Sequence, residues 1–88
     1  MAQHKSAEKR ARQAEKRRAR NRSVLSRTRS AVKGLRDAIA AGDAPTAAQR
    51  LRDAERSLRK AASQGVVPKR RADRSVSRLA KAVGKLGP

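Results

Sequence analysis

The residues whose types and spacing could do chemistry are concentrated near the N-terminus. Eleven Lys or Arg residues fall within residues 5–29, against two acids, Glu8 and Glu15. Both basic side chains bind phosphate by charge, and Arg adds a planar fork that holds two oxygens at once. A purely solvated helix would carry more compensating acid, so this run predicts a phosphate-binding segment. Its basic residues are Lys5, Lys9, Arg10, Arg12, Lys16, Arg17, Arg18, Arg20, Arg22, Arg27 and Arg29.

The spacing of these basic residues places them all round the helix that they are expected to form. Ala, Arg, Lys, Gln and Glu favour helices, and residues 5–29 contain no Gly and no Pro. Successive residues of a helix are about 100° apart, so the basic side chains point to most sides of the rod. No large apolar residue precedes Val24, so the segment has nothing with which to bury itself. We therefore expect residues 5–23 to be dynamic in the free protein and helical when bound.

The remaining composition disfavours catalysis and metal binding. The only His is His4, the seven acids are scattered, and Cys is absent. His4 is predicted to be a surface residue or an RNA contact rather than a metal ligand or a base. Gly34, Gly42 and Gly65 lie too far apart to form a phosphate-binding loop. We expect no enzyme activity, no cofactor, no metal and no small-molecule substrate.

Three classes of function compete for so basic a chain, whose net charge is +18. A membrane-active helix is disfavoured, because the most basic segment lacks the Leu, Trp or Phe residues that insert into lipid. The absence of aromatic residues removes stacking on single-stranded bases, which favours folded, double-helical nucleic acid. Folded RNA can enclose a rod, whereas a DNA duplex offers one surface. A structural RNA-binding protein is therefore preferred, with a nucleoid-type DNA-binding protein as the alternative.

Glycine and proline residues divide the chain into three predicted helices, over about residues 6–41, 44–63 and 69–86. Ser6 is placed at the N-cap of the first helix. Gly42 follows its C-cap, and Asp43 with Pro45 opens the second helix. These turns predict an all-α fold.

Helix lengths then predict the architecture. Apolar residues recur at helical spacing from Val24 onward, and the second and third helices are each roughly 30 Å long at about 1.5 Å per residue. Only the second half of the first helix matches that length. We therefore expect an antiparallel three-helix bundle over residues 24–88, packed on small residues, with residues 1–23 overhanging as a basic arm.

The outer faces of the second and third helices differ in charge. On the second helix, Arg52, Arg56 and Arg59 alternate with Asp53 and Glu55, which predicts ordinary solvated surface. The third helix is expected to have two faces, with a basic stripe opposite its apolar residues. The basic residues predicted to bind a second nucleic-acid element are Lys69, Arg70, Arg71, Arg74, Arg78, Lys81 and Lys85.

Several segments of the chain resemble the bacterial family of small-subunit ribosomal protein twenty, the S-twenty family. The family favours an opening close to Met-Ala-Asn-x-Lys-Ser-Ala-x-Lys-Arg, and this chain begins Met1-Ala2-Gln3-His4-Lys5-Ser6-Ala7-Glu8-Lys9-Arg10. The later matches are Asn21, Ser26-Arg27, Lys33, Ala41-Gly42-Asp43, Ala61-Ala62-Ser63-Gln64-Gly65-Val66-Val67 and Ala72-x-Arg74-x-x-Ser77-Arg78-Leu79. Each match alone is weak, but their order and spacing across nearly the whole chain are specific.

The resemblance implies a ribosomal protein of the cytoplasmic small subunit. Its partner would be the 16S ribosomal RNA, chiefly the 5′ domain and the long penultimate stem, which it would bind early in assembly. It would be a monomer within the particle, beside other small-subunit components and away from membranes. Ser6, Asn21 and Lys33 join the expected RNA-binding residues on this basis. Where the family usually has His followed by Lys-Asn-Lys, this chain has Pro68 and then Lys69-Arg70-Arg71, and Arg70 can still reach phosphate.

Overall fold

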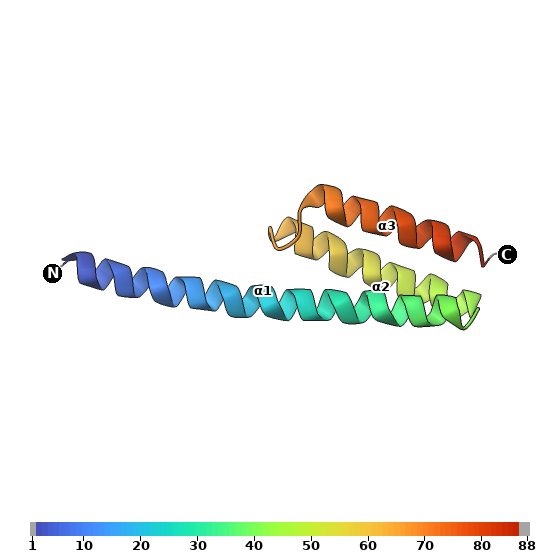
Figure 1. Ribbon diagram of the computed structural model, residues 1–88, viewed down its shortest axis with the longest axis horizontal. Helices are drawn as coiled ribbons and strands as arrows, with labels where there is room; N and C mark the ends of the chain where they lie inside the picture. The colour runs from blue at the N-terminus through green and yellow to red at the C-terminus, as the bar shows by residue number, and fades with distance from the viewer. Residues whose placement is uncertain (1, 87–88) are drawn as a thin grey trace.

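The protein folds into three helices joined by two short turns (Figure 1). The computed structural model describes residues 2–86, with side chains from Lys5 onward. Helix α1 spans Ala2–Ala40, α2 spans Ala44–Ser63 and α3 spans Lys69–Gly84. Successive helices run antiparallel, and the N-terminal half of α1 runs on alone past the ends of the other two. The predicted all-α fold with a long, overhanging first helix is confirmed.

The limits of two helices differ from those that the sequence indicated. Helix α1 begins at Ala2, so Ser6 lies inside it and the prediction that Ser6 is its N-cap was wrong. Helix-favouring residues flank Ser6 on both sides, so nothing there stops the helix from extending toward the N-terminus. Helix α3 ends at Gly84, two residues earlier than expected. Its last turn tightens there, since the Leu86 amide donates to the Val83 carbonyl at 3.0 Å.

The turn between α1 and α2 has the chemistry that its residues predict. Gly42 has a φ of +71°, a conformation that costs little only for glycine. The Asp43 amide donates to the Ala38 carbonyl at 3.1 Å, which closes the end of α1. The Asp43 carboxylate in turn accepts from the Thr46 amide at 3.2 Å and caps α2. Hydrogen bonds from Thr46 lower the pKa of Asp43, because they favour its ionised form.

The turn between α2 and α3 also ends its helix with a glycine of positive φ and a backbone hydrogen bond. Gly65 has a φ of +74°. The Val66 amide donates to the Ala61 carbonyl at 2.9 Å, so the last carbonyls of α2 are satisfied within the turn. Pro68 then precedes α3, where its fixed φ suits the start of a helix. Both predicted turns are therefore present.

The core is built mostly from alanine, with α2 in the middle. Helix α2 packs against both α1 and α3, whereas α1 and α3 make few contacts with each other. Thr28 is the one polar buried residue of the described part, and its hydroxyl donates to the Val24 carbonyl at 2.8 Å. The buried apolar residues are Leu35, Ala38, Ala47, Ala54, Leu58, Ala61, Ala72 and Leu79. Small side chains let the helices approach closely but leave little thickness of core.

The molecule is a rod with a short bundle at one end. Its extents are 66 × 21 × 14 Å. At about 1.5 Å per residue, the 39 residues of α1 span roughly 58 Å, about twice the length of α2. The bundle therefore supports only the C-terminal half of α1 and fixes the direction in which the other half projects.

Candidate nucleic-acid interface

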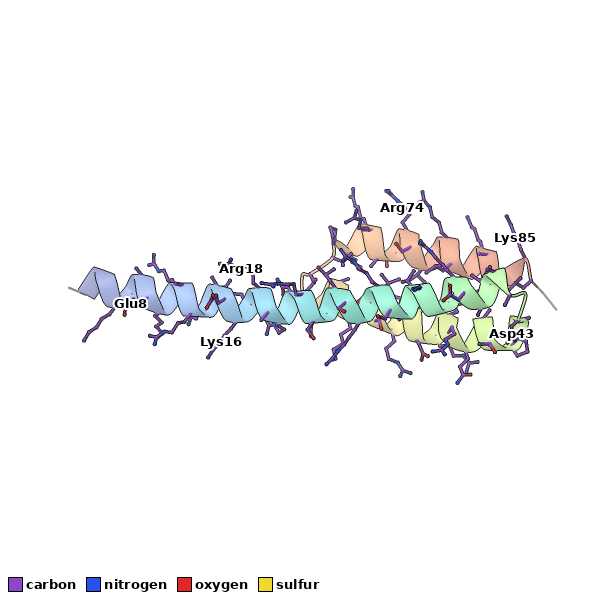
Figure 2. The ribbon with its side chains drawn as sticks, turned by 60° about the horizontal axis from the view of Figure 1, so that its bottom comes forward. Glu8, Lys16, Arg18, Asp43, Arg74 and Lys85 are labelled. Carbon is purple, nitrogen blue, oxygen red and sulfur yellow. The ribbon has the colours of Figure 1, made fainter. Side chains whose placement is uncertain are left out.

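The overhanging part of α1 presents its basic residues to solvent on all sides. Every residue from 5 to 23 is exposed except Ala14 and Asn21, which are half-buried. Lys16 and Arg18 leave the helix on opposite sides (Figure 2). This segment, residues 5–23, is called the arm below. Only its last turn, from Arg20 to Ser23, lies beside α2, so a partner could reach most of its charges from any direction.

Acidic residues of the chain do not neutralise these charges. Within the part of the chain whose side chains the structure describes, a single ion pair forms, between Arg59 Nε and Glu55 Oε1 at 3.0 Å on α2. Glu8 and Glu15 lie on the arm without such a partner. The basic residues are thus free to pair with an external anion.

Helix α3 carries the second basic surface. Arg74 and Lys85 project from the same side of the helix, away from α1 and α2 (Figure 2). Ala72 and Leu79 are buried on the opposite side, with exposed fractions of 1% and 8%. The residues of the exposed stripe are Arg70, Arg74, Arg78, Lys81 and Lys85, all exposed. Helix α3 is therefore two-faced, as its spacing predicted.

Three further predicted residues lie between these two surfaces. Arg29 and Lys33 of α1 face Arg71 of α3 across a groove of about 470 Å³, whose lining includes Leu58 of α2. The sequence analysis did not single out Arg36, which also lines this groove. Ser6 and Arg22 lie on the arm and Lys69 begins α3, and all three are exposed.

A pocket of about 440 Å³ lies where α1 leaves the bundle, beside the C-terminal end of α2. We call it the elbow pocket. Helix α1 contributes Arg20 and Arg27 to it, and α2 contributes Arg56 and Lys60. Neutral polar groups complete much of the lining, from Ser23, Ser57 and Gln64, beside Val24 and Thr28. The pocket therefore lies at the junction between the arm and the bundle.

Sequence reasoning missed the two basic residues that α2 contributes to the elbow pocket. Arg56 was assigned to a solvated surface, and Lys60 was not considered. A signal was present, because residues 56, 60 and 64 follow one another at four-residue spacing and so share one helix face. On α1, Arg20 continues the stripe of Val24 and Thr28 by one further turn. Placing these faces together required the register of α1 against α2, which the sequence does not state.

Metal-binding groups and membrane-spanning helices are both absent from the described residues. No group of three or more His, Cys, Asp or Glu residues comes together among them in a way that could hold a metal ion. None of the helices described is long and apolar enough to cross a membrane. The side chain of His4 lies outside the described part of the chain, so its expected role was not tested.

Known proteins match the chain over almost its whole length. The model of a family described as ribosomal protein S20 matches residues 2–84. The chain is 55% identical over 85 residues to small ribosomal subunit protein bS20 of Anaeromyxobacter dehalogenans, covering 97% of this chain and 92% of that protein. It is 48% identical over 86 residues to the protein of the same name from Campylobacter fetus, covering 98% of each.

A third relative gives the same result. Small ribosomal subunit protein bS20 of Wolinella succinogenes is 46% identical over 86 residues, covering 98% of this chain and 94% of that protein. The matched range contains all three helices, both turns and the whole basic arm. The chain therefore belongs to the ribosomal protein S20 family, as the resemblance of its motifs predicted.

Proposed function

We propose that this chain binds 16S ribosomal RNA directly and holds RNA helices together in the small ribosomal subunit. Membership of its family makes it a structural constituent of the ribosome rather than an enzyme. The observation that carries the proposal is the arm, a bare helix with cations on all sides and no internal ion pair. Such a segment gains stability mainly from an anionic partner, because almost all of its residues are exposed to solvent and only its last turn lies beside α2.

The two basic surfaces divide the binding between them. The arm inserts between RNA elements, which supply phosphates around its circumference. The α3 stripe holds a second RNA element, with Arg forks on backbone phosphates. The small bundle sets the angle between the two surfaces. The proposed contacts on the arm and α1 are Lys5, Ser6, Lys9, Arg10, Arg12, Lys16, Arg17, Arg18, Arg20, Asn21, Arg22, Arg27, Arg29 and Lys33.

The RNA elements are assigned on the family resemblance together with the shape of the protein. We place the arm and the α3 stripe on the 5′ domain and the long penultimate stem of 16S ribosomal RNA. A rod of 66 Å with two separate basic surfaces suits a contact that joins distant parts of one RNA. The protein acts there as a monomer and binds early in assembly, before later proteins close the particle around it.

Sedimentation of a cell lysate tests the cellular side of this proposal, and filter binding tests the molecular side. The protein should travel with the small ribosomal subunit, and the isolated chain should bind a 16S 5′-domain transcript more tightly than a DNA duplex of equal charge. Co-purification with genomic DNA and equal affinity for duplex DNA would instead support a nucleoid protein.

A further inference from the structure

The elbow pocket concentrates positive charge from two helices in one small volume. Arg20 and Arg27 reach it from α1, and Arg56 and Lys60 reach it from α2. None of its nine lining residues is acidic. The one ion pair of the described residues uses Arg59 and Glu55, which do not line the pocket. Four like charges around a shared space repel one another unless an anion lies between them.

The backbone near the pocket contributes negative charge, which must be compared with the positive charge of the side chains. Helix α2 ends at Ser63, so the negative end of its dipole, roughly half an elementary charge, lies beside the pocket. Arg56 and Lys60 place two full positive charges on that same end of the helix. The net field at the pocket is therefore positive, and it favours an anion.

The neutral lining and the size of the pocket narrow the choice of anion. Ser23, Ser57 and Gln64 supply hydroxyl and amide donors, which bind phosphate oxygens between the charged groups. A volume of about 440 Å³ lies in the range of small-ligand sites, about 300–1,000 Å³, and exceeds what one phosphate fills. Two consecutive phosphates with the sugar that joins them suit the space better.

We propose that the elbow pocket clamps two adjacent phosphates of an RNA backbone between α1 and α2. The proposal rests on the RNA-binding function proposed above and extends it to α2, whose outer surface the sequence analysis assigned to solvent. The clamp also has a mechanical consequence. Arg20 belongs to the overhanging arm, whereas Arg56 and Lys60 belong to α2, so phosphates bound by both helices fix the arm to the bundle.

A matched pair of double variants tests the clamp. Arg56→Gln with Lys60→Gln removes two charges from the pocket, and Arg52→Gln with Arg59→Gln removes two charges from α2 outside it. Glutamine keeps the helix propensity of α2, and far-ultraviolet circular dichroism checks that each variant folds. Because hydrogen bonds to charged groups are the stronger kind, the pocket variant should lose about ten- to a hundredfold in affinity for the 16S transcript. The control should lose clearly less.

Pyrophosphate serves as a second probe, since it carries two linked phosphates without the RNA. It should slow amide hydrogen exchange over residues 20–28 in the unaltered chain and in the control variant, but not in the pocket variant. Equal losses of RNA affinity in the two double variants, with no pyrophosphate protection in any of the three chains, would overturn the clamp. If the unaltered chain itself fails to bind the 16S transcript, the general RNA-binding function falls, which is a different outcome.

Discussion

Adjacent residues of α3 illustrate how one turn of helix separates stability from binding. Leu79 is buried against the alanine-rich core, with 8% of its surface exposed, whereas Arg78 is exposed. Their side chains are about 100° apart on the helix, so each belongs to a different surface. Substitutions at these two positions should therefore affect different properties of the protein.

Leu79→Ala should lower the free energy of unfolding by about 2–4 kcal/mol, because it removes buried methyl groups and leaves a cavity. Arg78→Ala should leave the unfolding free energy almost unchanged and weaken binding to 16S ribosomal RNA. Urea denaturation and filter binding measure the two properties separately. Equal unfolding of both variants, or normal RNA binding by Arg78→Ala, would show that the faces of α3 are assigned wrongly.

Glycines at different places in the fold should respond to alanine in opposite directions. Gly34 lies inside α1, and a Cβ atom there would meet Cδ and Nε of Arg50 at 3.9 Å, an ordinary contact. Gly34→Ala should therefore stabilise the protein by about 0.5–1 kcal/mol, through better helix propensity. Thermal unfolding measures the change.

Gly65→Ala is the matched comparison for Gly34→Ala. Its φ of +74° strains any residue with a Cβ atom, so alanine there should destabilise by about 1–2 kcal/mol although nothing lies within 4 Å. Destabilisation by Gly34→Ala as well would mean that Arg50 needs the bare backbone of α1 for its position.

At the scale of elements, the sequence predicted the turns correctly, but it did not predict where the first helix begins. Gly42, Asp43 and Pro45 together fixed the start of α2 at the expected residue, because each satisfies a separate requirement of the turn. The prediction of Ser6 as the N-cap of α1 failed because a serine suited to capping is also tolerated inside a helix. The elbow pocket could not be predicted, because Arg56 and Lys60 line the same pocket as Arg20 only when α1 and α2 pack in their observed register.

Helix α1 has two halves with different support, and this leads to a prediction about order. Residues 5–19 are exposed apart from the half-buried Ala14, and an isolated helix of this length is marginal in water. Amides from Lys9 to Arg20 should therefore exchange hydrogen rapidly in the free protein and slowly in the RNA complex. Exchange followed by mass spectrometry measures both states.

The amides around Leu35, which is fully buried, provide the internal control for this measurement. They should be protected in both states, because tertiary packing supports that half of α1. Strong protection from Lys9 to Arg20 in the absence of RNA would contradict the prediction and show that the arm is a stable helix by itself.

The charge of the whole molecule is distributed unevenly, and that distribution matches the shape. Residues 1–36 carry thirteen basic and two acidic residues, whereas residues 37–64, which include α2, carry five and four. Nine of these thirteen basic residues lie on the arm, which is the part that projects from the bundle. The family relationship, this charge layout and two separate basic surfaces were all predicted from the sequence, whereas the elbow pocket between α1 and α2 needed the structure.

The salt dependence of RNA binding should report this layout directly. Each neutralised phosphate releases condensed counterions, so the logarithm of affinity falls linearly with the logarithm of salt concentration. If about eight of the eleven basic residues in residues 5–29 reach phosphate, the slope should be about −6 to −7. Deletion of residues 1–22 removes nine of these eleven. The slope should then become much less negative, because only the few phosphate contacts of α3 and the rest of α1 remain.

Filter binding at several salt concentrations, with the full chain and the truncated chain, measures this slope. Circular dichroism should show that α2 and α3 remain helical in the truncated chain, so that a lower slope reflects lost contacts rather than unfolding. Plain duplex DNA provides the second comparison, and its affinity should be lower because a duplex cannot surround the arm. An unchanged slope after truncation would show that the arm is a passive tail. Equal affinity for duplex DNA at every salt concentration would leave only non-specific attraction between charges.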